Sequence, residues 1–189
     1  MNQYERRLPH WDVVDARQFV TFRLRGTLPA SRVFHSRDIT AGQAFIAMDR
    51  LLDSARSGPA FLRLPEIAEI VVEAIHDGAR PFQRYEVHSF AVMPNHVHLL
   101  VTSKKPLAIW LRSLKGFTGH RALQILNQRG PFWQDESYDH LVRNDEEFRR
   151  ILRYIEWNPV KAGLVSSPEQ FPWSSAGQKA GRRAEAPPH

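Results

Sequence analysis

The pattern of apolar and polar residues predicts one strand and two helices in the first part of the chain. In residues 19–25, Phe and Leu alternate with Thr and Arg until Gly26, as expected for a half-buried strand. Apolar residues then recur at helical spacing in residues 42–52. A second helix is predicted to begin at Pro65 and end at Gly78, because proline is favoured at the first helical position and glycine ends helices.

Two further strands are predicted to form a β-hairpin. Residues 85–93 and 96–102 both have strand composition, and Pro94 and Asn95 interrupt them. Alternation places five residues of the first strand on one face: Tyr85, Val87, Ser89, Ala91 and Met93. We expect this hairpin to be central to the sheet.

The second half of the chain is predicted to be mainly helical. Residues 106–128 have helical periodicity, but Gly116 and Gly119 are points where this helix bends or divides. Residues 132–142 are compatible with a strand or with irregular structure.

A last helix is predicted over residues 145–157. Asn144 precedes it as a capping residue, and Glu147 occupies the capping-box position. Its apolar stripe consists of Phe148, Ile151, Leu152 and Ile155. This stripe sets the direction in which the helix is buried.

This order of elements indicates an α+β fold, an antiparallel sheet with helices on one face. The length of 189 residues is sufficient for one domain with a hydrophobic core. We expect a single domain over residues 17–176, an N-terminal extension over residues 1–16 and a mobile tail over residues 177–189.

Composition excludes several classes of protein. No apolar run approaches the ~20 residues that span a bilayer, and no charged-then-apolar leader follows Met1, so neither a membrane protein nor a secreted precursor is expected. The absence of cysteine excludes disulfides, iron–sulfur clusters, thiol nucleophiles and thiolate zinc sites. Any metal must therefore bind His, Asn, Asp or Glu.

The excess positive charge is concentrated in one segment. The chain has 26 Lys and Arg against 20 Asp and Glu, a net charge of +6. Residues 101–130 contain six basic residues and no acidic one, which equals the whole excess: Lys104, Lys105, Arg112, Lys115, Arg121 and Arg129. A solvated helix face normally mixes signs, so this segment, with Trp110 and Phe117 inside it, favours a surface that contacts nucleic-acid phosphates.

The sharpest chemical feature is the sequence His96-Val97-His98. In a strand, side chains two residues apart point to the same face, so both imidazoles can converge on one cation while Val97 turns into the core. The alternative is a pair of half-exposed strand histidines without a metal. Two histidines do not complete a metal site, so a third ligand must come from elsewhere.

The last helix offers that ligand and a nucleophile. Tyr154 and Asn158 are four residues apart and lie together on one flank of the apolar stripe. A phenol is a poor nucleophile at neutral pH, so a tyrosine used as one needs a cation on the electrophile. A metal held by His96, His98 and the Asn158 carboxamide would lie beside Tyr154. The alternative is that Tyr154 covers the core margin and that Asn158, before Pro159, ends the helix.

Four linked motifs resemble the REP-associated tyrosine transposases, relatives of the single-tyrosine HUH transposases of insertion sequences. They are Met-Pro-Asn-His-Val-His-Leu-Leu at residues 93–100, Phe-Trp-Gln-Asp-Glu-Ser-Tyr-Asp-His at 132–140, Tyr-Ile-Glu-Trp-Asn-Pro-Val-Lys-Ala-Gly at 154–163, and Pro-Trp-Ser-Ser at 172–175. The opening is also similar to one branch of that family, with His10-Trp11, Phe-Val-Thr-Phe-Arg-Leu at 19–24, and Leu28-Pro29. The resemblance covers residues 9–176.

This resemblance implies a ferredoxin-like antiparallel sheet with an HUH hairpin and a DNA strand-transfer reaction. It implies Mg²⁺ or Mn²⁺ held by His96, His98 and Asn158, attack by Tyr154 on a phosphate, and a 5′-phosphotyrosine intermediate. It also implies a single-stranded or hairpin DNA substrate of the repetitive extragenic (REP) kind. We expect a monomer or homodimer in the cytoplasm, associated with the nucleoid.

DNA binding is expected to fall to the basic segment, through Lys104, Lys105, Arg112, Lys115 and Arg121, with Trp110 and Phe117 available for base stacking or for the core. Tyr138 is the rival nucleophile, although the resemblance associates its segment with structure. Residues 45–64 are longer than in compact members of the family. His120 and His140 are interpreted as surface or hydrogen-bonded histidines.

Two other functions remain open from the sequence. One is a protein that binds DNA hairpins without cutting them, because a retained fold does not guarantee activity. The other is a metal-dependent nuclease that uses water as its nucleophile and forms no covalent adduct.

Overall fold

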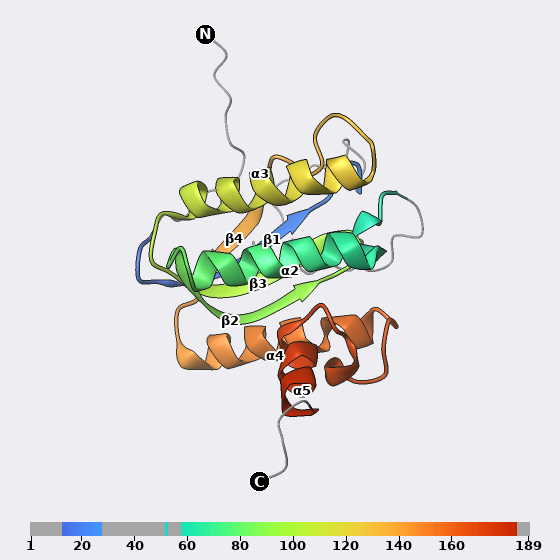
Figure 1. The fold of residues 1–189 in the computed structure, drawn as a ribbon. Helices are drawn as coiled ribbons and strands as arrows, with labels where there is room; N and C mark the ends of the chain where they lie inside the picture. The colour runs from blue at the N-terminus through green and yellow to red at the C-terminus, as the bar shows by residue number, and fades with distance from the viewer. Residues whose placement is uncertain (1–12, 28–51, 53–57, 185–189) are drawn as a thin grey trace, which may run out of the picture.

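The computed structural model describes residues 13–27, 52 and 58–184 (Figure 1). The helix predicted over residues 42–52 lies outside the described residues except for Leu52, which is buried. Most of the expected N-terminal extension also lies outside them. None of the described helices is long and apolar enough to cross a membrane.

The described elements follow a βαββαβ order with additional helices at the end. They are β1 (Arg17–Arg23), the 3-10 helix η1 (Phe61–Arg63), α2 (Pro65–Ala79), β2 (Tyr85–Val92), β3 (His96–Ser103), α3 (Leu107–Ile125), β4 (Tyr138–Leu141), α4 (Asp145–Lys161), the 3-10 helix η2 (Pro168–Gln170) and α5 (Ser175–Ala184). The four strands form one antiparallel sheet in the order β2-β3-β1-β4. This is the ferredoxin-like arrangement, so the expected α+β fold is confirmed.

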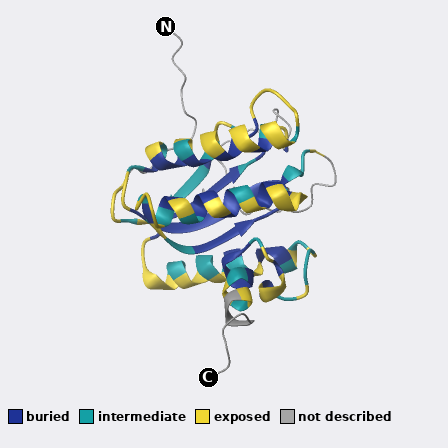
Figure 2. Ribbon diagram, in the orientation of Figure 1, coloured by how far each residue is buried: buried dark blue, intermediate teal, exposed yellow. Residues whose placement is uncertain are grey.

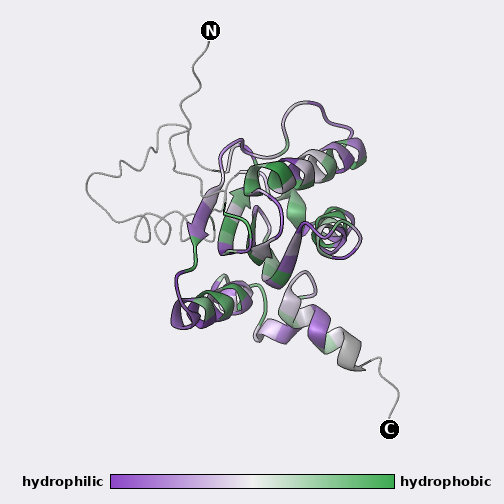
Figure 3. Cartoon of the chain, turned by 90° about the vertical axis from the view of Figure 1, so that its left-hand side faces the viewer, coloured by the Kyte–Doolittle hydropathy of each residue, from purple (hydrophilic) through white to green (hydrophobic). Residues whose placement is uncertain are grey.

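Helices cover both faces of the sheet, whereas the sequence analysis expected them on one (Figures 1 and 3). On β3, Val97, Leu99 and Val101 join the core beneath α2 and α3. Leu100, from the opposite face of the same strand, joins a second core beneath α4. The central strands β1 and β3 are therefore buried on both faces (Figure 2).

A β-bulge in β2 corrects the predicted face of the first hairpin strand. Val87 pairs with Val101 and Ser89 with Leu100, so His88 is an extra residue between them. The extra residue reverses the alternation. Tyr85 and Val87 therefore pack toward α2 and α3, whereas Ala91 and Met93 pack toward α4.

The helix predicted to bend or divide at its glycines is the single unbroken helix α3. Gly119 is required for packing rather than for bending. A Cβ atom there would lie 3.2 Å from Trp133 Cδ1 and 3.3 Å from Phe132 Cβ, which is tighter than ordinary contact.

The last predicted helix is confirmed as α4, and its cap is as expected. The Asn144 side chain accepts a hydrogen bond of 2.8 Å from the Glu147 backbone N–H. The helix contains Pro159 and continues to Lys161. α5 then occupies the first part of the segment expected to be an irregular tail.

Candidate functional site

His96 and His98 lie on the face of β3 that α4 covers. Neither side chain is exposed, so the alternative of two half-exposed histidines is wrong. The two Nε2 atoms lie 3.0 Å apart, and Val97 is buried in the opposite core. The convergence predicted from their spacing is therefore present.

The preceding residue, Asn95, fixes the proton on His96. Asn95 Nδ2 donates to the Leu52 carbonyl oxygen at 2.9 Å, so its Oδ1 faces His96 Nδ1 at 2.6 Å. An amide oxygen only accepts, so His96 Nδ1 donates. In the neutral ring the Nε2 atom then carries a lone pair directed toward His98.

Thr21 orients the second imidazole. Its hydroxyl lies 2.8 Å from His98 Nδ1, and the two residues are direct partners in the pairing of β1 with β3. A hydroxyl can accept the Nδ1 proton, which leaves the His98 Nε2 lone pair available in the same way. Neither Thr21 nor Asn95 is among the site residues predicted from the sequence. Alternation placed Thr21 on the polar side of its strand, but only the strand register places it at His98.

Tyr154 approaches His98 from α4, and Asn158 lies one turn further along the same helix. The Tyr154 ring centroid lies 5.7 Å from that of His98, with the rings at 67°. The Tyr154 hydroxyl and Asn158 Oδ1 are both buried. Because α4 continues to Lys161, the alternative that Asn158 ends the helix is wrong. Tyr154 also packs against the second core, as expected from the alternative in which it covers the core margin.

Tyr138, the rival nucleophile, is close to the same site. It pairs with Thr21 across β1 and β4, and the Phe19 ring lies 6.3 Å from the rings of both Tyr138 and Tyr154. Burial, with a smaller effect of Asp139, raises the pKa of Tyr138 to about 12. Both tyrosines border the same site, and the nucleophile is to be assigned by substitution of each.

Two cations that the sequence analysis did not single out lie beside the site. Lys161 Nζ is 4.9 Å from the centroid of the Tyr154 ring. Arg23 is the strand partner of His96, and its guanidinium donates to Thr27 Oγ1 at 3.1 Å. Burial lowers the pKa of Arg23, and the opposing effect of Glu136 is smaller. Both residues belong to motifs quoted above, but only the fold brings Lys161 to Tyr154 and Arg23 to His96.

The donor set fits a small divalent cation. Two ligands at right angles around an octahedral ion, each at about 2.1 Å, lie about 3.0 Å apart, and the two Nε2 atoms have this spacing. The described residues contain no group of three or more His, Asp or Glu suited to a metal. The third protein ligand would therefore be the Asn158 carboxamide, an oxygen donor of the kind that Mg²⁺ and Mn²⁺ accept.

The structure does not bring the predicted DNA-binding residues together at this site. Lys104 and Lys105 follow β3 at its far end, about 26 Å from His96 at 3.3 Å per residue. Arg112 and Arg121 are exposed on α3, across the sheet from α4. Nine residues separate them, which places them on opposite flanks of that helix.

The remaining basic residue, Lys115, serves the fold. Its ammonium group donates to the Gln134 and Asp135 carbonyl oxygens at 2.7 and 2.9 Å. Burial lowers the pKa of Lys115 to about 8.

The other side chains named beside the basic segment divide between core and surface. Trp110 is fully buried, so it belongs to the core and cannot stack on a base, whereas Phe117 is exposed. The interpretation of the two other histidines is confirmed, since His140 Nε2 lies 2.9 Å from a Glu147 oxygen and His120 is exposed.

Comparison with known proteins identifies relatives of the sequence. A model of the family described as "Transposase IS200 like" matches residues 64–158, half of the chain, including both histidines, Tyr154 and Asn158. The REP-associated tyrosine transposase of Escherichia coli is 30% identical over 100 residues, covering 51% of this chain and 55% of that protein. A protein of Haemophilus influenzae is 31% identical over 103 residues, covering 48% and 58%. The chain thus spans little more than half the length of the curated relatives it matches.

A solved structure shows the same fold. It is a REP-associated tyrosine transposase bound to a REP hairpin, with a TM-score of 0.56 and 21% identity, covering 98% of this chain and 89% of that one. The similarity therefore extends over nearly the whole chain, including β1 and α5.

Proposed function

Because the chain belongs to the family of IS200-like transposases, we propose that it cuts and rejoins single-stranded DNA through a covalent bond to Tyr154. The observation that carries the proposal is the meeting of two distant elements. The Tyr154 ring from α4 contacts His98, whose Nε2 atom lies 3.0 Å from that of His96. A phenol and a pair of imidazoles are thus adjacent on one face of the sheet, as the proposed nucleophile and cation ligands require.

In the proposed step, Tyr154 Oη attacks the phosphorus of a phosphodiester. A bond forms between Oη and phosphorus, and the bond from phosphorus to the 3′ oxygen breaks. The phenol loses its proton, the departing 3′ oxygen gains one, and the downstream strand remains attached through its 5′ phosphate. The intermediate retains a phosphodiester, so a 3′-hydroxyl can attack it and rejoin the DNA.

The surrounding residues support this chemistry in different ways. A divalent cation held by His96, His98 and Asn158 would polarise the phosphate and offset negative charge in the transition state. Asn95 and Thr21 hold the imidazoles in their metal-binding orientation. The ammonium of Lys161, over the ring of Tyr154, favours the negative charge that develops on the phenol.

The proposed substrate is a DNA hairpin with a single-stranded flank. The E. coli relative is named for its association with REP elements, and the solved relative is bound to a REP hairpin. The positive charge of the chain is consistent with a polyanionic partner. A DNA substrate would place the protein at the nucleoid.

The test is a denaturing gel of protein incubated with labelled hairpin DNA and Mn²⁺. Label at the 3′ end should migrate with the protein and label at the 5′ end should not, because Tyr154 takes the downstream 5′ phosphate. Tyr154→Phe should lose both nicking and adduct, whereas Tyr138→Phe should retain them.

The other outcomes identify the alternatives. Nicking by Tyr154→Phe without any adduct would indicate a nuclease that uses water, and binding without cleavage in every form would indicate a hairpin-binding protein. An adduct in Tyr154→Phe that disappears in Tyr138→Phe would assign the nucleophile to Tyr138.

A further inference from the structure

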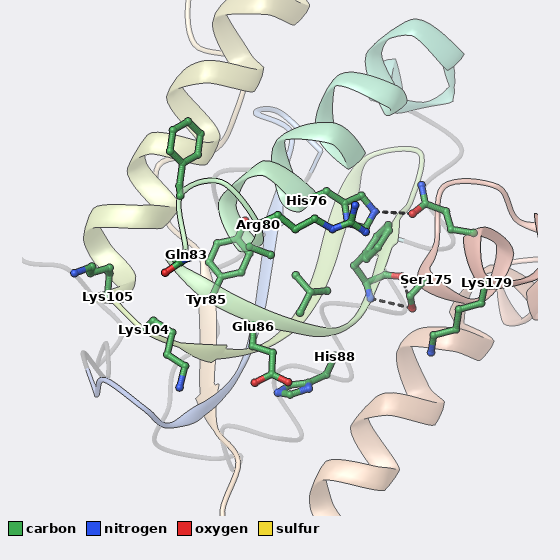
Figure 4. Close-up of a pocket in the computed structure, with 15 residues that line it drawn as sticks. His76, Arg80, Gln83, Tyr85, Glu86, His88, Lys104, Lys105, Ser175 and Lys179 are labelled. Atoms are coloured by element: carbon green, nitrogen blue, oxygen red, sulfur yellow. Dashed lines mark hydrogen bonds between the residues drawn. The ribbon is translucent and has the colours of Figure 1, made fainter. Parts of the chain in front are cut away.

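A groove of about 810 Å³ lies along the edge strand β2, and its lining includes neither His96 nor His98 (Figure 4). Residues 173–175 cover one end of this edge: Val92 N–H donates to the Trp173 carbonyl at 2.9 Å, and Phe90 N–H donates to Ser175 Oγ at 3.2 Å. The groove opens beside the remaining part of the strand, from Tyr85. Its walls come from the end of α2, the turn between β3 and α3, and the start of α5.

The groove is positively charged. Its charged lining residues are four bases, Arg80, Lys104, Lys105 and Lys179, and one acid, Glu86. Lys104 pairs with Asp15 at 2.8 Å, and Lys179 with Glu156 at 3.7 Å. Within the part of the chain that the structure describes, no ion pair involves Arg80 or Lys105. These two cations are therefore available to an anionic ligand.

An aromatic ring stands at the rim of the same groove. The side chain of Phe82 is 57% exposed, and the Arg84 guanidinium lies 4.5 Å from the centroid of its ring. A cationic groove with an exposed aromatic ring is the arrangement with which proteins bind single-stranded nucleic acid, because phosphates contact the cations and a base stacks on the ring.

We propose that this groove binds the single-stranded DNA that flanks the hairpin. The inference deepens the proposed function, on which it rests, by assigning the flank a place in the fold. A volume of this order encloses a drug-sized ligand, so it suits a few unstacked nucleotides rather than a duplex. Val87 in the groove pairs with Val101, three residues from His98, which is about 11 Å along the sheet at ordinary strand spacings. The groove therefore lies close to the strand that carries the histidines, within reach of a single-stranded flank of a few nucleotides.

The test measures binding without divalent cation, so that no DNA is cut. The probes are a hairpin oligonucleotide with a six-nucleotide single-stranded flank on either side and the same hairpin with a blunt end. Phe82→Leu, which keeps an apolar side chain but removes the ring, should weaken binding of a flanked hairpin roughly tenfold. The double variant Arg80→Ala with Lys105→Ala should flatten the slope of log K against log[salt] by about 1.4, at about 0.7 per phosphate of a single strand.

Neither change should alter binding of the blunt hairpin. Arg129→Ala is the control for loss of a cation outside the groove, because Arg129 follows the opposite end of α3, and it should leave the flank contribution unchanged. Wild-type affinity and slope for the flanked hairpin in the groove variants would overturn the proposal. An equal loss for blunt and flanked hairpins would also overturn it, because the groove would then bind the stem.

The binding test of the groove and the adduct test of Tyr154 can fail independently. At saturating flanked DNA the groove variants should still form the covalent adduct. Absence of an adduct in the wild type would refute the proposed reaction but leave the difference between flanked and blunt hairpins intact.

Discussion

At the residue scale, two side chains decide what the histidine pair can bind. A free imidazole presents either nitrogen as its lone-pair donor, and the partner of the other nitrogen selects which. Asn95 selects Nε2 on His96, and Thr21 can select it on His98. When the Thr21 hydroxyl accepts the His98 Nδ1 proton, both lone pairs face the 3.0 Å space between the two Nε2 atoms.

Thr21→Val therefore should weaken Mn²⁺ binding about tenfold, since outer-shell partners of metal-bound histidines typically contribute 10–100-fold in affinity. Valine keeps the shape of this buried residue and removes only the hydroxyl. Thr102→Val is the matched control. Thr102 lies on the same face of β3 as His98, four residues further along the strand, and its hydroxyl hydrogen-bonds to His88. Calorimetric titration with Mn²⁺ checks both variants, and equal affinity in Thr21→Val and the wild type would refute the orienting role.

At the scale of elements, the closeness of α2 to β2 depends on Gly78. The Tyr85 ring lies directly against it, and the Tyr85 hydroxyl donates to the Ile75 carbonyl of the same helix at 3.0 Å. Gly78→Ala would drive a methyl group into this buried ring and should lower the free energy of unfolding by about 2 kcal/mol or more. Urea unfolding measures the change.

Gly116→Ala is the control for this substitution. Gly116 also lies within a helix, but a Cβ atom there would have open space around it. Alanine should raise the free energy of unfolding by up to about 1 kcal/mol through helix propensity. Similar effects at both glycines would mean that Tyr85 moves aside at no cost.

Lys115 on α3 donates hydrogen bonds to backbone carbonyls just before β4, and its contribution to the free energy of unfolding should depend on pH. Burial lowers its pKa from 10.5 to about 8 in the folded protein. Between these values the unfolded chain retains a proton that the folded chain has lost, so the contribution of Lys115 to stability rises with pH in this window. Below about pH 8 the lysine is protonated in both states, and its contribution does not change.

The measurement is urea unfolding of the wild type and Lys115→Met at pH 7.5 and pH 10. From the first pH to the second, the wild type should gain up to about 3 kcal/mol relative to the variant. Lys105→Met, an exposed lysine, controls for the loss of a charge. A constant difference between wild type and Lys115→Met at the two pH values would contradict the lowered pKa.

At the scale of the whole molecule, local periodicity predicted the strands β1 to β3 and the helices α2 to α4, but neither α5 nor which surfaces meet. The spacing of His96 and His98 specified their convergence, and the spacing of Tyr154 and Asn158 placed them on one flank of a helix. The bulge at His88 has no signal in an alternating pattern, so Tyr85 and Met93 were wrongly predicted to share one face of the strand. The partnership of Thr21 with His98 depends on strands 77 residues apart, which no local pattern encodes.

For the basic segment, too, the sequence did not predict which side chains share a surface. Its charges are contiguous in sequence but diverge in space. Arg121 lies one turn beyond Phe117, which lines a hollow between α2 and α3. Arg112 lies three residues before Lys115, on the flank that contacts Gln134. One DNA stem cannot readily contact both flanks of α3.

The flank of Arg121 is the one that adjoins α2, and the cationic groove begins at the end of α2. A stem whose single-stranded flank occupies that groove should continue over this side of the helical layer. We therefore expect Arg121→Ala to flatten the salt slope of hairpin binding by about 0.9, the value for one phosphate contact on a duplex, and Arg112→Ala to leave it unchanged. Lys115→Met should also leave the slope unchanged, because its ammonium group is engaged by backbone carbonyls. Titrations of blunt hairpin at several salt concentrations decide the matter, and a flattened slope in Arg112→Ala with none in Arg121→Ala would place the stem on the opposite side of α3.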